Sequence, residues 1–299
     1  TCIETHYQRP GLASCYLLQE GDAAALIDTG TAYTVPFIVE LLRLRGVQPQ
    51  QVKYVVPTHV HLDHAGGTGQ LMQHLPQAKL VVHPQGARHL IDPAKLTAGA
   101  SAVYGEEKFV QDFGELIPVA AQRVMEAPDG LVLDLNGRKL RCLDTPGHAR
   151  HHLCLWDEQS RGFFTGDTFG LAYKELYTEK GPFLMLPSTP VQFDPVALQA
   201  SILRLMEVKP DCMYLTHYGR IDNVFENTLG SVSNEDVLGL TTGRRAQPGT
   251  FNMIVGQLAR SSQRLSSGFA SAVEYTFQKS GPRSGCVAVN TTRLVARAV

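Results

Sequence analysis

The chain has 299 residues, a formal net charge of −1 and 43% hydrophobic residues. This length suits one large domain or two modest ones, and the composition is that of a globular protein rather than a disordered chain. No apolar run reaches the roughly 18 residues that a membrane-spanning helix needs. Because the chain begins at Thr1 without a recognisable secretory signal, we expect a cytoplasmic protein.

The cysteines and the charge distribution exclude two further classes. Six cysteines are scattered without a C-x-x-C pair, so we expect no disulfide framework and read Cys15, Cys142, Cys154 and Cys212 as small buried residues. From Thr241 onward basic residues greatly outnumber acidic ones. This basic tail has no tight Lys/Arg block and no interleaved aromatic residues, so we expect no nucleic-acid partner.

The first third of the chain alternates strands and helices. Apolar residues at 15–18 and 23–28 flank a polar turn and predict two antiparallel strands. Helical spacing predicts a helix at 34–44, and a buried strand follows at 52–56.

A polar, His-rich turn at 58–67 leads into a predicted helix at 68–74 and a strand at 79–83. Residues 86–113 are expected to form helices and loops. Residues 130–135 and 138–143 flank Asn136-Gly137, which is typical of a β-hairpin.

The later elements alternate in the same way. We expect a strand pair at 152–156 and 162–165, and a loop at 144–151 because Pro146 and Gly147 interrupt regular structure. A helix is predicted at 193–208, with Val196 and Leu198 on its apolar side, and a last strand at 212–215.

The residues that carry chemistry begin directly after the strand at 52–56. His59, His61, Asp63 and His64 crowd into six residues of a turn, and imidazole and carboxylate are the ligands that suit zinc and similar metals. His59 and His61 are two apart, so in an extended segment both can face one ion. Asp63 and His64 would then turn toward a second ion.

This run resembles the HxHxDH signature of the metallo-β-lactamase superfamily. Three later segments match that family in the same order: Thr145-Pro146-Gly147-His148, Phe164-Thr165-Gly166-Asp167 and Thr216-His217. The resemblance extends over residues 15–218. It implies an α/β fold of the αββα type, two mixed sheets flanked by helices, in a domain at 1–225. A Ser/Gly/Arg-rich tail of uncertain structure follows at 226–299.

The resemblance also implies a set of ligands. His59, His61 and His148 would bind a first metal, Asp63, His64 and His217 a second, and Asp167 would bridge the two. Asp28 and His152 are expected to support these ligands, because a metal-binding histidine normally donates its other ring N–H to a partner. Capping of a turn is an equal alternative for Asp28.

These expectations point to a metal-dependent hydrolase of a small-molecule ester, thioester, lactone or phosphoester. Two zinc ions would generate a bridging hydroxide, with iron or manganese as alternative metals, and Asp63 would orient the hydroxide. Glyoxalase II shares all seven ligands, but its glutathione-binding helical domain has no recognisable counterpart in the tail. Substrate-binding candidates are Tyr173, Tyr218 and His89.

Two other functions stay open. One is a persulfide-dioxygenase-like oxidoreductase with a single iron held by two histidines and an aspartate, and the other is a catalytically idle metal-binding protein. Metal count and identity separate the three. We expect no membrane partner, and a homodimer remains an open alternative.

Overall fold

The computed structural model describes residues 1–177, 182, 184, 185, 190, 192–222 and 224. All of them lie in one compact unit, Thr1–Asn227. The tail predicted at 226–299 lies outside the described residues. Among the helices of the described part, none is long and apolar enough to cross a membrane.

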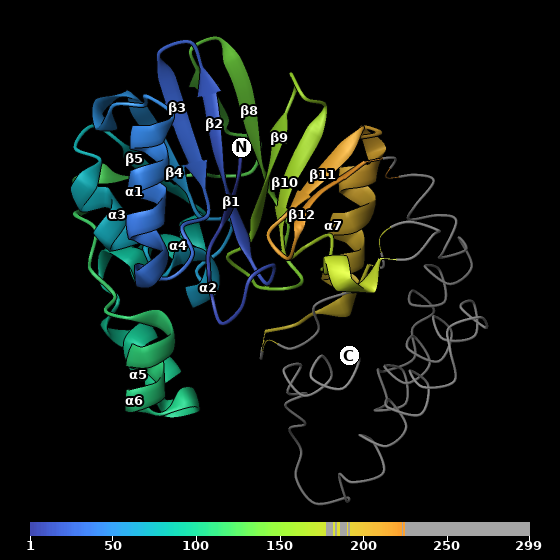
Figure 1. Ribbon diagram of the computed structural model, residues 1–299. Helices are drawn as coiled ribbons and strands as arrows, with labels where there is room; N and C mark the ends of the chain where they lie inside the picture. Colours follow the sequence, from blue (N-terminus) through green and yellow to red (C-terminus); the bar gives the residue numbers. More distant parts are fainter. Residues whose placement is uncertain (178–181, 183, 186–189, 191, 223, 225–299) are drawn as a thin grey trace, which may run out of the picture. The chain divides into compact units, whose positions relative to one another are not determined.

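Two six-stranded sheets form the centre of this unit (Figure 1). In the first, the order follows the chain: β1 (Cys2–Glu4), β2 (Ser14–Glu20), β3 (Ala23–Ile27), β4 (Val52–Val56), β5 (Lys79–Val82) and β6 (Val124–Glu126). The pairs from β1 to β3 are antiparallel, and those from β3 to β6 are parallel. The parallel part requires crossovers, which the helices between these strands supply.

The second sheet has the order β12-β11-β10-β9-β8-β7. Its strands are β7 (Val132–Leu135), β8 (Arg138–Asp144), β9 (Leu153–Asp157), β10 (Gly162–Gly166), β11 (Cys212–Leu215) and β12 (Gly219–Asp222). Only the pair β10 and β11 is parallel among these strands, and the helix α7 (Pro195–Glu207) makes that crossover.

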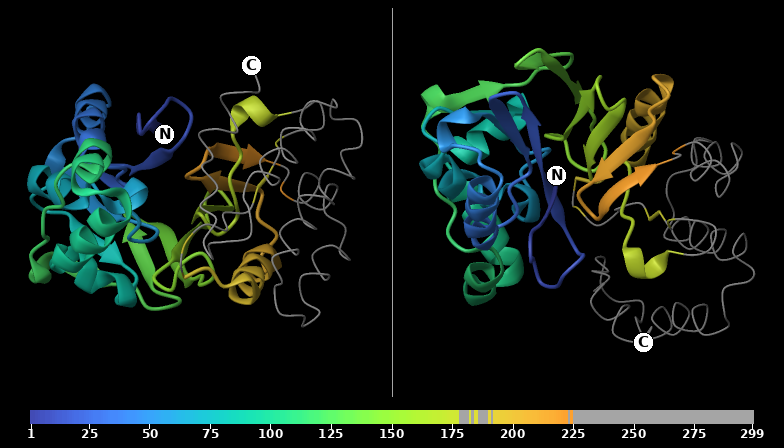
Figure 2. Two further views of the ribbon diagram at one scale, coloured as in Figure 1. Left: turned by 90° about the horizontal axis from the view of Figure 1, so that it is seen from below. Right: turned by 45° about the horizontal axis from the view of Figure 1, so that its top comes forward.

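Apolar layers explain why the sheets and helices stack. Side chains such as Ile27 and Val56 from the first sheet meet Leu140 and Phe164 from the second in the core between the sheets. The outer face of the first sheet is covered by α1 (Val35–Leu44), α3 (Thr68–His74) and α4 (Pro84–Ile91), and that of the second by α7. Figure 2 shows this order of helix, sheet, sheet and helix.

The remaining helices are short or peripheral. They are α2 (Leu62–Ala65), α5 (Ala94–Tyr104), α6 (Glu106–Phe113) and the 3₁₀ turns η1 (Ala32–Thr34), η2 (Pro49–Gln51), η3 (Ala121–Arg123) and η4 (Lys174–Leu176). Helix α5 buries none of its residues and pairs with α6 as a hairpin at the margin of the unit (Figure 1).

The structure confirms the αββα fold and most predicted elements, with three corrections. The predicted turn at 58–67 contains a helical turn, α2, and the edge strands β1, β6 and β12 were not predicted. Val196 was assigned to the apolar face of its helix, but it is 70% exposed. It is two residues before the buried Leu198, and residues two apart on a helix face nearly opposite sides. The four cysteines predicted to be buried are buried.

Candidate metal centre

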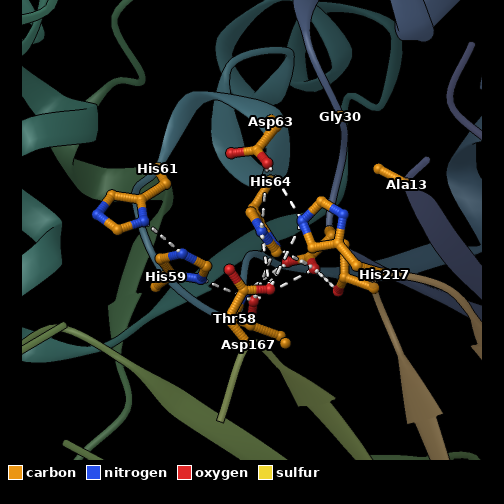
Figure 3. A network of polar contacts seen from close by, with 12 residues as sticks. Ala13, Gly30, Thr58, His59, His61, Asp63, His64, Asp167 and His217 are labelled. Carbon is orange, nitrogen blue, oxygen red and sulfur yellow. Dashed lines mark hydrogen bonds and ion pairs between the residues drawn. The ribbon is translucent and has the colours of Figure 1, made fainter. Parts of the chain in front are cut away.

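All the predicted ligands lie at one edge of the sandwich, where several strands end. His59 follows β4, Asp167 follows β10 and His217 follows β11, and these strands run parallel to a neighbour within their sheets. His148 comes from the loop that joins β8 to β9. Because carboxyl ends of parallel strands meet at the same sheet edge, segments far apart in the sequence converge there (Figure 3).

The local backbone of the first motif divides its side chains into two sets. His61 is extended and is the N-cap of α2, so His59 and His61 lie on one side of the segment. Asp63 and His64 lie within the helical turn that follows and project elsewhere (Figure 3). Thr29 fastens this turn to the end of β3, because its backbone N–H and hydroxyl both donate to the carbonyl of His64, at 2.7 and 3.0 Å.

Three imidazoles form the first donor group. Nε2 of His59 lies 2.8 Å from Nδ1 of His61, and Nε2 of His148 lies 3.0 Å from the same atom. The donor atoms of these three residues are all within 4.8 Å of one another, which is close enough to hold one metal ion. Three histidines with an open fourth position are a ligand set typical of a catalytic zinc site.

Asp63, His64 and His217 form a second donor group by the same criterion. Nε2 of His217 lies 3.2 Å from the carboxylate of Asp63. Asp167 lies between the two groups: its Oδ2 is 3.3 Å from Nε2 of His148, and its Oδ1 is 3.4 Å from Nε2 of His64. The seven predicted ligands are therefore brought together, with Asp167 in the intermediate position.

Partners on the far side of the rings orient the histidines. Asp28, which is buried, accepts a hydrogen bond from Nδ1 of His64 at 2.9 Å, and the carbonyl of Leu12 accepts one from Nδ1 of His217 at 2.7 Å. Such partners fix the tautomer and leave Nε2 free for a metal. Asp28 thus contacts a predicted ligand directly rather than only capping a turn.

His152 supports Asp167 instead. Its Nε2 accepts a hydrogen bond from the backbone N–H of Asp167 at 3.1 Å, so Nδ1 carries the proton and donates to Thr145 at 2.9 Å. Burial and neighbouring histidines hold the pKa of His152 well below its usual value, which keeps this arrangement neutral. His152 therefore positions the predicted ligand Asp167 and is not itself in a position to bind a metal.

The charges of the centre suit a cation. Burial, followed by the neighbouring His148, lowers the pKa of His61 to about 3, so this imidazole is neutral, as a metal ligand must be. Burial also opposes charge on His64, but the carboxylates of Asp167, Asp63 and Asp28 raise its pKa well above the usual value. Without a metal, a proton on His64 would balance these carboxylates.

Two buried atoms point to the same conclusion. Nε2 of His64 and Oδ1 of Asp167 are shielded from solvent and lie 3.4 Å apart, but neither makes a hydrogen bond among the described residues. Buried polar atoms in native proteins are nearly always paired, so unpaired donor atoms that converge on one point indicate a missing partner. The residues present therefore fit metal binding.

The centre opens on the side of His61 and Asp63. Both are partly exposed, and the side chain of Asp63 is 25% exposed, whereas His59, His64, His148, Asp167 and His217 are buried. A substrate would therefore approach from the side of α2.

The substrate-binding candidates occupy different places. Tyr173 is close, with its ring centroid 6.4 Å from that of His217. Tyr218 turns away and donates its hydroxyl to Glu4 at 3.2 Å. His89 is not beside a predicted ligand, but its ring centroid lies 6.2 Å from that of His151.

Sequence reasoning missed two residues beside the centre. His151 packs on the first donor group, with its ring centroid 5.7 Å from that of His61, and its position between His148 and His152 was the available signal. Tyr7 packs against the cluster around Leu62, the neighbour of Asp63, and nothing in the local sequence indicated it because the loop after β1 had no predicted structure.

Comparisons with known proteins agree with this geometry. A family model described as the metallo-beta-lactamase superfamily matches residues 9–217. The metallo-beta-lactamase fold-containing protein ST1585 of Sulfurisphaera tokodaii is 28% identical over 216 residues, which are 71% of this chain and 75% of that protein. An atrochrysone carboxyl ACP thioesterase of Aspergillus chevalieri is 29% identical over 152 residues, which are 51% of this chain but only 38% of the thioesterase.

Solved structures share the fold. The crystal structure of the archaeal ST1585 protein from Sulfolobus tokodaii matches with a TM-score of 0.59 and 23% identity, over 85% of this chain and 92% of that one. The TTHA1429 protein of Thermus thermophilus matches with a TM-score of 0.56 and 22% identity, over 95% and 94% of the two chains. With a family model that matches most of its length, this chain belongs to the metallo-beta-lactamase superfamily.

Proposed function

We propose that this protein is a metal-dependent hydrolase that holds two zinc ions and cleaves a thioester, with esters, lactones and phosphoesters as related candidates. The observation that carries the proposal is the position of Asp167, whose two carboxylate oxygens face different donor groups, one toward His148 and the other toward His64. A carboxylate so placed is suited to bridge two ions. The convergence of all seven donors supports two ions over a single iron, which needs only three ligands.

Each part of the centre has a role in this proposal. His59, His61 and His148 would hold the first ion, and Asp63, His64 and His217 the second. When bound, two such ions supply an acidified water and polarise the carbonyl under attack. The hydrogen bonds that His64 and His217 donate from Nδ1 to Asp28 and to the carbonyl of Leu12 leave Nε2 of each ring as the metal-binding atom and aim it at the site.

Asp63 is positioned to accept a proton from the attacking water. Burial opposes its charge, but His64 and the hydrogen bond from His217 outweigh burial and hold the pKa of Asp63 below its usual value. Its carboxylate is therefore ionised at neutral pH, and it is the predicted carboxylate ligand on the exposed side of the centre. It can orient an attacking water and accept a proton from it.

The names of relatives favour a thioester among the substrate classes. Besides the Aspergillus chevalieri enzyme, a protein named thioesterase pkgB from Emericella nidulans is 28% identical over 152 residues, which are 34% of its length. The match covers less than half of either thioesterase and, at 152 residues, is shorter than the stretch from His59 to His217, so it does not include all seven predicted ligands. The names of these relatives therefore support the reaction class only. The acyl group that the enzyme accepts must be inferred from the residues of this chain.

Elemental analysis of the full chain purified without added metal tests the metal, and hydrolysis of N-acetylcysteamine thioesters tests the reaction. We expect about two zinc ions per chain, as in other dinuclear sites, and thioester turnover that a chelator abolishes. The variant His59→Ala should lose the ion of the first donor group and, with it, turnover. One iron per chain with no thioester hydrolysis would overturn the proposal in favour of oxidation chemistry, and metal without any turnover would indicate an idle protein.

A further inference from the structure

Aromatic side chains gather on the exposed side of the centre. Leu62, the neighbour of Asp63, is buried against Phe109 and Phe113 of α6, and Tyr7 from the loop after β1 packs against the same cluster. Tyr104, at the end of α5, adds its ring to that of Phe113. We call Tyr7, Tyr104, Phe109 and Phe113 the aromatic wall.

The rings of the wall are in mutual contact. The ring centroids of Tyr7 and Phe113 are 5.7 Å apart with an angle of 28° between the planes, and those of Tyr104 and Phe113 are 5.4 Å apart. Phe109 and Phe113 are buried, whereas Tyr104 is 48% exposed. The wall therefore has a fixed interior and presents an aromatic face to solvent.

The wall adjoins the helical turn that carries Asp63. Asp63 and Leu62 are adjacent in α2, so the residue that opens the centre and the residue that supports the wall belong to one helical turn. Burial, and after it the nearby charge of Asp63, raises the pKa of both Tyr7 and Tyr104, which agrees with phenols on the Asp63 side of the wall.

The loop that carries Tyr7 is held in place from two sides. The carbonyl of Leu12 accepts the hydrogen bond from His217, and the guanidinium of Arg9 forms an ion pair of 2.6 Å with Glu175. The same guanidinium lies 5.2 Å from the ring centroid of Tyr173. Tyr7 is thus positioned before any substrate arrives, which lowers the entropy cost of binding on its ring.

We infer that the aromatic wall is the acyl-binding site of this enzyme and that its substrates carry an apolar, preferably aromatic, acyl group. The inference rests on the proposed hydrolase function and names its substrate class. A planar acyl group can stack on the exposed rings while its carbonyl reaches the centre beside Asp63.

The first test measures binding of 2-naphthoate to the zinc-loaded full chain by fluorescence titration. Tyr104→Ser should raise the Kd about 10-fold, the size expected for losing contact with a partly buried large side chain, while Tyr104→Phe should restore it. Val103→Ala is the matched control: it changes the adjacent residue of α5, which is 76% exposed and outside the wall, and it should leave the Kd unchanged. Equal affinity in the wild type and Tyr104→Ser would overturn the inference.

The second test compares turnover of two N-acetylcysteamine thioesters, one of acetate and one of 2-naphthoate. The ratio of kcat/KM for naphthoyl over acetyl should fall about 10-fold in Tyr104→Ser and stay constant in Val103→Ala. An unchanged ratio in Tyr104→Ser contradicts the acyl-binding role. If the wild type hydrolyses neither thioester, the proposed thioesterase function is wrong. The naphthoate titration would still decide whether the wall binds aromatic groups.

Discussion

The carboxylate of Asp28 accepts a hydrogen bond from His64 and also ties together the two sheets. Its Oδ1 accepts from the backbone N–H of Thr58 at 2.7 Å, and its Oδ2 accepts from the hydroxyl of Thr216 at 2.7 Å. Thr58 follows a strand of the first sheet and Thr216 a strand of the second. One buried carboxylate therefore orients a predicted ligand and holds the sheet ends between which the metals would bind.

Asp28→Asn should weaken the second metal site selectively. The substitution replaces one acceptor oxygen by an NH₂ donor in a cluster of donors, so the hydrogen bond to His64 loses its charge and part of its geometry. We expect about a 10- to 100-fold loss of zinc affinity at that site, measured by chelator competition. Asp211→Asn, which changes an exposed carboxylate paired with Arg161, serves as the control. Unaltered affinity in Asp28→Asn would show that Asp28 only caps its turn.

His148→Ala and His217→Ala should each remove one ion and leave the other. His148 belongs to the first donor group and His217 to the second, and no donor group found among the described residues contains both. Elemental analysis should therefore find about one zinc per chain in each variant, and turnover should fall by more than about 100-fold, the upper range seen for the outer partners of ligands. Loss of both ions from either single variant would mean that the two groups act as one site.

Asp167→Ala should lose more metal than either histidine variant, because Asp167 lies between the groups. Its expression should change little, and its thermal unfolding should match that of the metal-free wild type, because Asp167 follows the end of β10 and is not part of the apolar clusters. Circular dichroism separates these effects from misfolding. Two retained ions would contradict the bridging role.

The sequence predicted the fold well where regular patterns carry the information. The strand at 52–56 and the helix at 68–74 were predicted with their observed bounds, because a buried apolar run and a helical period are local signals. The edge strands β1, β6 and β12 were missed since each has only three or four residues, and pairing with a neighbour rather than composition makes them strands.

The donor residues of the centre were also predictable, because they lie in four short motifs that match the order of a known family. Among the residues around these donors, Asp28 and His152 were expected, whereas Leu12, Tyr7 and Tyr104 were not. Leu12 contacts His217 through a backbone carbonyl, which no side-chain pattern can indicate. Tyr7 and Tyr104 reach the exposed side through a loop and a helix hairpin whose positions depend on packing against Phe113. The sequence therefore predicted which donor residues the fold brings together but not the aromatic wall beside them.

The buried ion pair between Arg138 and Asp157 should make stability depend on pH. Nε of Arg138 donates to Asp157 at 2.9 Å, and the carboxylate is fully buried. Burial alone would raise the pKa of Asp157, but the hydrogen bonds from Arg138 and Ser160 outweigh it and lower the pKa. Because the folded-state pKa lies below the usual value of about 3.9, the stabilisation is present above about pH 4 and is lost as pH falls below it.

Asp157→Asn should consequently destabilise the protein by about 3 kcal/mol at pH 7, as for other broken buried pairs, and by less near pH 3. Urea unfolding at the two pH values measures the difference. Asp134→Asn removes an exposed partner of Lys139 in the same sheet, where solvent screens the charges, so it should show a much smaller dependence on pH. A destabilisation by Asp157→Asn that is equal at both pH values would assign the effect to packing instead of charge.

Gly147→Ala should displace His148. Gly147 has a φ of +133°, and a Cβ at this position would lie 2.3 Å from the backbone nitrogen of Leu198 in α7. The loop cannot move away freely, because the carbonyl of Gly147 accepts a hydrogen bond of 2.7 Å from Asp194 and that of Pro146 one of 2.7 Å from Ser201. Backbone strain and the clash together should cost more than about 2 kcal/mol.

Gly137→Ala is a control that distinguishes the backbone strain of a positive φ from the steric clash of the added Cβ. Gly137 also has a positive φ, +94°, but a Cβ there would meet no atom within 4 Å, so its substitution should cost only the backbone strain of about 1 kcal/mol. Zinc content distinguishes the two further, since only Gly147 adjoins a predicted ligand. We expect Gly137→Ala to keep both ions and Gly147→Ala to lose the ion of the first group. Equal stability and equal zinc content in the two variants would mean that the loop can shift without moving His148, and that its packing on α7 does not position the metal centre.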